Sequence, residues 1–216
     1  MRILTPHSLR RRQCLRALLA TGSMPISLGL RADALPEEPK ESEGFYSIPL
    51  STASQSAGFT LMDLDGEQLT PSSFPGSVFV LFFGFLSCPS ICPTTMMELV
   101  SARRMLGDDA QRVRIAFATL DPERDSAAAM RQWLGYFGDD LVGLRDSPEA
   151  ILEATQALRL PWQRVPGTDS DPDYYMIDHG VQSYTYDPQG RLRLLVRPGP
   201  TPQQIAADWR SLLNGA

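Results

Sequence analysis

The sequence predicts an α/β protein with a thioredoxin-like fold, in which a central mixed sheet is flanked by helices and preceded by an N-terminal hairpin. Three observations predict this class. Residues 78–83 are apolar at every position, which is typical of a strand covered on both faces by helices. Strand and helix patterns then alternate, as in a β-α-β sheet. The chain ends differently, with two strand patterns around a turn and one last helix.

The first half of the domain contains the hairpin and the central strand. Residues 59–64 alternate apolar and polar side chains, which predicts a half-buried strand, and Asp65-Gly66 is a hairpin turn sequence. After the buried strand, Pro93 and Thr94 are expected to open a helix that continues to about Leu106, because proline is favoured at the first helical position. Two cysteines lie in the turn between strand and helix.

The second half continues the alternation and closes the sheet. A second strand is predicted at 113–120, an amphipathic helix at 126–137, and a further helix from Ser147 to about Leu158. Residues 180–186 and 192–196 flank the turn sequence at 187–190, which predicts a hairpin. A helix at 202–213 completes the order.

Residues 1–34 have the features of an export signal. Arg11-Arg12 precede a weakly apolar stretch that is shorter and more broken than the roughly 20 residues of a membrane-spanning helix, and Ala32-Asp33-Ala34 is a cleavage pattern. We therefore expect a twin-arginine signal at 1–34, a linker at 35–57, and one domain at 58–216. The expected location is the periplasm; an uncleaved signal would instead anchor the protein to the inner membrane, facing the periplasm.

The charge of the chain narrows the classes of partner. Residues 35–216 contain 14 basic and 24 acidic residues, a formal charge of −10. Nucleic acids and anionic membrane surfaces attract clustered Lys and Arg, so neither is an expected partner. Lys40 is the only lysine, which makes lysine chemistry improbable.

Only three cysteine and histidine residues follow the signal: Cys88, Cys92 and His179. The two cysteines are four positions apart at the start of a helix, where the helix N-terminus is expected to lower a thiol pKa. They can bridge each other or share an ion. A structural disulfide is the plainer interpretation, although a domain of this size has little need of one.

His179 precedes the predicted terminal hairpin. A lone histidine is more often a hydrogen-bonded or surface residue than a ligand, but in this fold the loop before that hairpin packs beside the cysteine-bearing helix. Two thiolates and one imidazole suit copper, as Cu(I) or Cu(II), whereas structural zinc normally requires a fourth protein ligand. Asp178 is a candidate acceptor for the ring N–H.

Four blocks of sequence resemble the Sco (SenC-type) copper chaperones over residues 58–213. They are Phe59-Thr60-Leu61, the run from Phe82 through Cys88 and Cys92 to Thr95, Asp121-Pro122-Glu123-Arg124-Asp125, and Asp178-His179 with Tyr184 and the 187–190 turn. The resemblance implies one copper bound by Cys88, Cys92 and His179. It also implies delivery to the binuclear copper centre of a cytochrome c oxidase subunit, with other periplasmic copper carriers as further partners.

The two cysteines are also compatible with functions other than copper delivery. The resemblance also implies that the thiols could reduce the disulfide of the acceptor, and the alternative function is therefore a thiol-disulfide oxidoreductase with Cys88 and Cys92 as redox thiols. A thiol peroxidase fits poorly, because the sequence around the cysteines lacks a peroxiredoxin-style motif. Ser90, Leu86-Ser87 and Gly180 depart from the family pattern; none removes a ligand, but each alters the surroundings that tune metal affinity.

Overall fold

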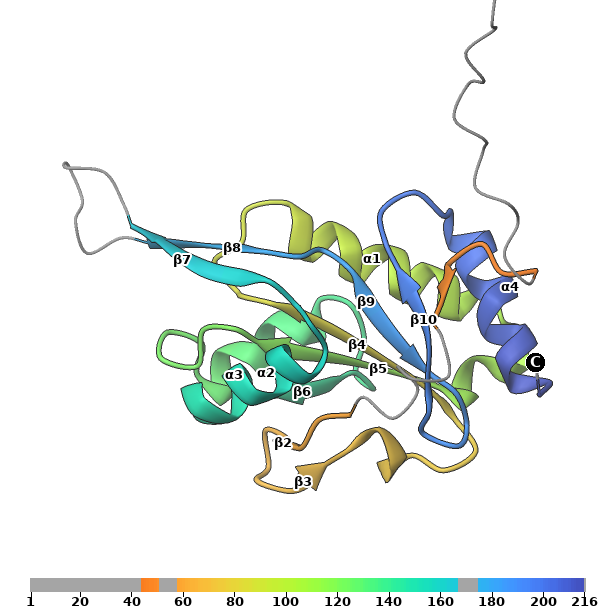
Figure 1. Cartoon of the computed structure of the whole chain (residues 1–216), viewed down its shortest axis with the longest axis horizontal. Coiled ribbons are helices and arrows are strands. Elements are labelled where there is room, and N and C mark those ends of the chain that lie inside the picture. Colours follow the sequence, from red (N-terminus) through yellow and green to blue (C-terminus); the bar gives the residue numbers. More distant parts are fainter. Residues whose placement is uncertain (1–43, 51–57, 167–174, 216) are drawn as a thin grey trace, which may run out of the picture. The chain divides into compact units, whose positions relative to one another are not determined.

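The computed structural model describes residues 44–50, 58–166 and 175–215 (Figure 1). Its main feature is a six-stranded sheet in the order β1-β10-β9-β4-β5-β6. The strands are β1 (Ile48–Pro49), β4 (Val78–Gly84), β5 (Val113–Thr119), β6 (Val142–Leu144), β9 (Ser183–Tyr186) and β10 (Leu192–Val196). β4, β5 and β6 pair in parallel, whereas β9 pairs antiparallel with both β4 and β10. The predicted mixed sheet is confirmed.

The sheet is centred on the apolar run that predicted it. All seven residues of β4 are buried, and β5 is buried at every position except Arg114. Removing such side chains from water stabilises the fold by about 1.5–3 kcal/mol for each large apolar group. Helices α1 (Ile91–Arg104) and α4 (Pro202–Leu213) pack on each other along one face, with α2 (Ala127–Gly135) and α3 (Pro148–Ala157) across the sheet from them (Figure 1).

The helix starts follow from local capping chemistry. The hydroxyls of Ser126 and Ser147 accept hydrogen bonds from the backbone N–H groups of Ala129 and Ala150, which satisfies donors that a helix leaves free. Thr201 begins α4 with a capping box, in which its own N–H donates to the side chain of Gln204. These caps place the helix starts within a residue of the predicted positions.

Two small strand pairs lie outside the main sheet. The N-terminal hairpin forms from β2 (Leu61–Met62) and β3 (Gln68–Leu69), as predicted. The second pair, here called the ribbon, is β7 (Trp162–Pro166) antiparallel to β8 (Tyr175–His179). Two 3₁₀ helices, η2 (Pro71–Ser73) and η3 (Gly107–Arg112), complete the described elements.

Several elements differ from the sequence prediction. His179 ends strand β8, so its placement in a loop was wrong; cross-strand pairing with β7 extends the segment. Helix α1 begins at Ile91 rather than at Pro93, which puts Cys92 inside the helix. Strand β1, within the stretch expected as a linker, pairs with β10.

The predicted export signal lies outside the described residues. In the part of the chain that the structure describes, no helix combines the length and apolar character needed to cross a membrane.

Candidate metal centre

The cysteine-bearing turn connects the end of β4 to α1. Cys88 lies in the turn and Cys92 in the first turn of the helix, and both are free thiols. The backbone N–H of Cys92 donates to the Sγ of Cys88 at 3.4 Å, so the turn folds the two residues toward each other. Cys88 is 9% exposed and Cys92 is fully buried. The thiol of Cys88 is therefore the one nearer to solvent.

Gly84 makes room for the buried thiol. A Cβ at this position would lie 2.8 Å from the Sγ of Cys92 and 2.8 Å from a ring carbon of Phe117. Neither atom belongs to a flexible surface side chain, so only glycine fits without displacing the core. The tight turn after β4 thus depends on the absence of a side chain at its start.

Burial decides the ionisation of Cys92. Desolvation raises the pKa of Cys92 far above the ordinary value of a thiol, and Cys88 and Asp125 raise it further, while a backbone hydrogen bond involving Phe85 opposes the shift. The expectation that the helix N-terminus lowers the thiol pKa is therefore wrong for Cys92, because the cost of burying a thiolate outweighs the helix dipole. In the copper-free protein Cys92 is a neutral thiol.

His179 faces the buried cysteine across 87 positions of sequence. Its Nε2 lies 3.6 Å from the Sγ of Cys92. The imidazole ring lies beside Phe82 and Phe85, with ring centroids 6.2 and 5.9 Å apart. Desolvation lowers the pKa of His179, so the ring is neutral near pH 7, as a metal ligand must be.

The second ring nitrogen fixes the tautomer. Nδ1 lies 2.8 Å from the carbonyl oxygen of Gly180, which can only accept, so Nδ1 carries the proton and Nε2 presents its lone pair. Asp178, the acceptor considered from the sequence, is exposed and makes no hydrogen bond to the ring. The backbone carbonyl of Gly180 accepts the hydrogen bond from the ring instead, and residue types alone do not predict a backbone acceptor.

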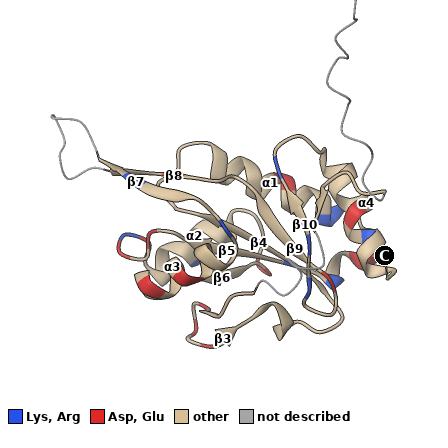
Figure 2. Cartoon of the chain, viewed as in Figure 1, with Lys and Arg blue, Asp and Glu red and all other residues tan. Residues whose placement is uncertain are grey.

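A shallow pocket of about 340 Å³ opens at this point of the surface. It is lined by both Cys88 and His179 together with apolar side chains. The apolar members are Phe85, Pro89, Ile91, Met176, Ile177 and Val181. Figure 2 shows acidic residues on α3 and in the turn between β2 and β3, whereas the chain from the end of β4 into the start of α1 is uncharged. Ser90 and the exposed carboxylate of Asp178 also line the pocket, so the thiol and imidazole are reached through a mouth that is mostly apolar with one acid at its edge.

The structure brings Cys92 close to His179 and to Cys88, each as a pair. Among the residues that the structure describes, no three Cys, His, Asp or Glu side chains form a closed metal-binding cluster. Cys92 and His179 are adjacent, and the Sγ of Cys88 lies 3.4 Å from the backbone nitrogen of Cys92 on the same turn. The acids that precede β8 in the sequence, Asp169, Asp171 and Asp173, lie outside the described residues.

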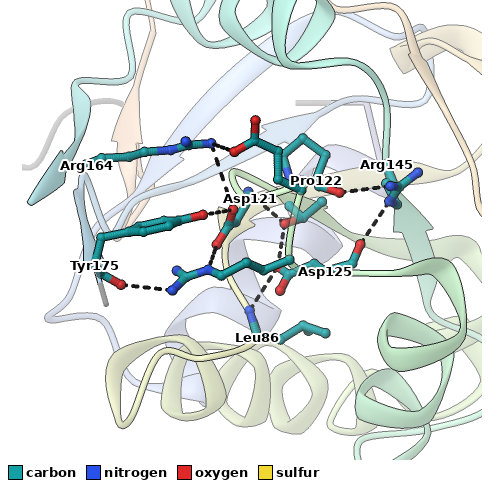
Figure 3. A network of polar contacts seen from close by, with 10 residues as sticks. Leu86, Asp121, Pro122, Asp125, Arg145, Arg164 and Tyr175 are labelled. Atoms are coloured by element: carbon teal, nitrogen blue, oxygen red, sulfur yellow. Dashed lines mark hydrogen bonds and ion pairs between the residues drawn. The ribbon is translucent and has the colours of Figure 1, made fainter. Parts of the chain in front are cut away.

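A polar network lies beside the cysteine turn (Figure 3). It is built on the turn of residues 121–125, in which two of the three acids, Asp121 and Asp125, are buried. Arg124 pairs with Asp121. Tyr175, at the start of β8, donates its hydroxyl to Asp121 at 2.7 Å. Sequence analysis did not single out Tyr175; its aromatic ring and position before His179 were the only signals.

Two methionines follow the cysteines in α1, and only one of them is a core residue. Met96 is fully buried, whereas Met97 is 61% exposed. The phenylalanines of β4 are buried, as predicted.

A sequence model of the SCO1/SenC family matches residues 49–214. The chain belongs to the SCO1/SenC family. A relative of this SCO1/SenC member, a SCO2-like protein of Rickettsia conorii, is 30% identical over 174 residues, covering 81% of this chain and 82% of the relative.

Solved structures of the family superpose on this SCO1/SenC member. Bradyrhizobium japonicum ScoI with copper bound is 34% identical, with a TM-score of 0.64 over 72% of this chain and 97% of that one. Apo Sco1 from Thermus thermophilus is 31% identical, with a TM-score of 0.62 over 79% and 94% of the two chains. The thioredoxin-like fold of the SCO1/SenC protein is confirmed.

Proposed function

We propose that this protein is an exported copper chaperone, which binds one copper ion through Cys88, Cys92 and His179. The observation that carries the proposal is the 3.6 Å approach of the His179 Nε2 to the Cys92 Sγ, with that nitrogen unprotonated and aimed at the thiol. Membership of the SCO1/SenC family and the copper in the Bradyrhizobium structure support it.

The donor set suits copper by its chemistry. Thiolates are soft ligands that select Cu(I), and imidazole is a good ligand for either oxidation state of copper. Binding releases the proton of each thiol. The positive charge of the ion then offsets the cost of burying a thiolate at Cys92. Three ligands complete a Cu(I) site, while Cu(II) can accept a water or a carboxylate in addition.

We infer that the ion leaves by stepwise ligand exchange. Cys88 and His179 line the apolar pocket, so an incoming thiolate reaches the ion from that side while Cys92 still holds it from below. Each bond to a departing donor is replaced by a bond to the acceptor, and copper is never released to water. The acceptor that the family implies is the binuclear copper site of cytochrome c oxidase, with other periplasmic copper carriers as further partners.

The proposed location is the periplasm. Arg11-Arg12 and the Ala32-Asp33-Ala34 cleavage pattern support export of a protein whose thiols are needed outside the cytoplasm. An uncleaved signal would leave the same domain anchored to the inner membrane.

Reduction of the acceptor is the second candidate function, and the two free thiols favour it. The more exposed Cys88 would attack one sulfur of an acceptor disulfide as the thiolate, releasing the other sulfur. Cys92, once deprotonated, would then attack the mixed disulfide. The acceptor gains two electrons as two thiols, and the protein is left with a Cys88–Cys92 disulfide. His179 is not needed for this exchange.

The test is an anaerobic Cu(I) titration of the reduced protein against a competing chelator, beside His179→Ala. One copper per chain, held at least tenfold more weakly without His179, is the expected result. The loaded protein is then mixed with a reduced, copper-free acceptor domain, and metal in the acceptor is measured. Tight binding that is indifferent to His179, or no delivery, would favour the disulfide exchange function.

A further inference from the structure

We propose that the turn of residues 121–125 is a positioning element, which sets the separation between the two cysteines and His179. The inference rests on the proposed copper function. Asp125 holds the segment that leads into the cysteines, and Asp121 with Arg124 holds the strand that ends in His179 (Figure 3).

The first connection runs from Asp125 to the cysteine turn. The carboxylate of Asp125 accepts a hydrogen bond from the backbone N–H of Leu86 at 3.1 Å, two residues before Cys88. The same oxygen accepts the hydroxyl of Thr119, at the end of β5, at 2.5 Å. Asp125 is 2% exposed, so its bonds are shielded from competing water. The cysteine turn is thereby tied to the end of the neighbouring strand.

The second connection runs from Asp121 to the ribbon. Tyr175 donates its hydroxyl to Asp121, and the guanidinium of Arg124 donates to the carbonyl of Tyr175 at 3.0 Å. The same guanidinium lies over the Tyr175 ring, 3.6 Å from its centroid, and pairs with Asp121. Arg164, on β7, lies over the ring at 4.9 Å and pairs with Glu123. Both strands of the ribbon are therefore attached to one turn.

The backbone of the turn is fixed from a third side. Arg145 donates from Nε to the carbonyl of Asp125 and from a terminal nitrogen to the carbonyl of Pro122, each at 2.8 Å. With its backbone fixed, the turn transmits the position of one attached loop to the other. The arrangement matters for the ion because metal–ligand distances must fall within about 0.2 Å of their ideal values.

The ribbon needs such an attachment more than the cysteine turn does. β8 pairs with β7 and, within the described residues, with no strand of the main sheet. The cysteine turn, by contrast, continues directly from β4 at the centre of the sheet. A two-stranded pair is only marginally stable by itself. Contacts at Tyr175, the first residue of β8, thus help to set where His179, its last residue, lies.

The test is a double-mutant cycle on copper affinity. Tyr175→Phe keeps the ring and removes the hydroxyl that reaches Asp121. We expect it to weaken Cu(I) binding by about tenfold in the otherwise unchanged protein. In a His179→Ala background, where the imidazole no longer contributes, the same substitution should change affinity by less than about twofold. A general loss of folding would weaken binding in both backgrounds alike.

Asp125 is tested through its own pair of variants. Asp125→Ala removes the acceptor of the Leu86 N–H and should weaken Cu(I) binding in both backgrounds, because it acts through the cysteines. Asp125→Asn retains an oxygen that can accept that bond and should restore most of the affinity. Arg131→Ala, which breaks an exposed ion pair with Asp65, is the matched control and should leave affinity unchanged.

A readout without copper separates this inference from the proposed function. The ring-proton NMR resonances of His179, which lies beside Phe82 and Phe85, report its position in the metal-free protein. Tyr175→Phe should shift them and Arg131→Ala should not. Unmoved resonances, or an equal loss of affinity from Tyr175→Phe with and without His179, would overturn the inference. Shifted resonances in a protein that binds no copper would uphold the positioning role and reject the chaperone.

Discussion

The two halves of the candidate site are held in opposite ways. The thiol half grows out of the central strand of the sheet, with Cys92 fully buried and packed against the backbone of Gly84. The imidazole half belongs to a separate two-stranded ribbon, which is attached by polar contacts at Tyr175 and Arg164 and by the buried side chain of Ile177. The thiol half is fixed by close packing in the core, whereas the imidazole half combines less extensive packing with hydrogen bonds and ion pairs.

This difference suggests an order of events in the proposed transfer. Donors held by core packing keep their positions while an ion is exchanged, because packed interiors deform little. A donor on the ribbon can withdraw at lower cost, since local opening is easiest where few buried apolar contacts hold a segment. His179 is therefore the first protein ligand expected to leave, and Cys92 the last.

The largest expected effect on Cu(I) affinity comes from replacing a cysteine of the thiol half. Cys92→Ser should lower Cu(I) affinity by more than about 100-fold, because a hydroxyl is a poor ligand for a soft ion. His179→Ala should cost about tenfold under the same conditions. Competition with a Cu(I) chelator measures both values. Equal losses would contradict the asymmetry between the halves, and a far-ultraviolet CD spectrum controls for folding.

Two glycines allow the same comparison on stability. Gly84→Ala brings a methyl group against the Cys92 thiol and the Phe117 ring, and should lower the free energy of unfolding by about 1–3 kcal/mol. Gly180→Ala meets the end of the Gln182 side chain at 2.5 Å and a methyl of Leu160 at 2.9 Å. Because the long glutamine side chain can rotate away, Gly180→Ala should lower the free energy of unfolding by less than Gly84→Ala does. Urea unfolding of both variants gives the ranking.

The smallest expected effect is the pH dependence of the metal-free protein. His179 has a lowered pKa, so the unfolded chain binds its proton more readily, and stability should fall as pH drops below about 6.5. Cys92 has a raised pKa, so the unfolded chain loses its proton first, and stability should fall as pH rises above about 8.5.

Unfolding curves across this range, with single variants, separate the two limits. His179→Ala should flatten the acidic side, and Cys92→Ser the alkaline side. Changes that persist in both variants would assign the pH dependence to other groups.

Sequence reasoning was strongest where structure is local. The run at 78–83 and the caps at Ser126 and Ser147 act through neighbouring residues, and the predicted elements are confirmed there. It was weaker where a partner lies far along the chain. Strand β8 forms because it pairs with β7, and neither segment has a sequence pattern that predicts this pairing.

The same limit applies within the site. The approach of Cys92 and His179 was predicted from the expected fold, and the structure places them adjacent. The raised pKa of Cys92 was missed because spacing conveys nothing about burial. The tautomer of His179 was missed because its acceptor is a backbone carbonyl, which every residue has.

The pairing of β7 with β8 also determines which kind of donor atom faces the cysteine. Trp162 is opposite His179, and Gln163 is opposite Asp178. Successive side chains of a strand point to opposite faces, so a slip of one position would turn the imidazole away from the cysteine. Asp178 would then take its place and offer a hard oxygen instead of a borderline nitrogen. The register of this short ribbon thus decides whether an imidazole nitrogen or a carboxylate oxygen faces the Cys92 thiol.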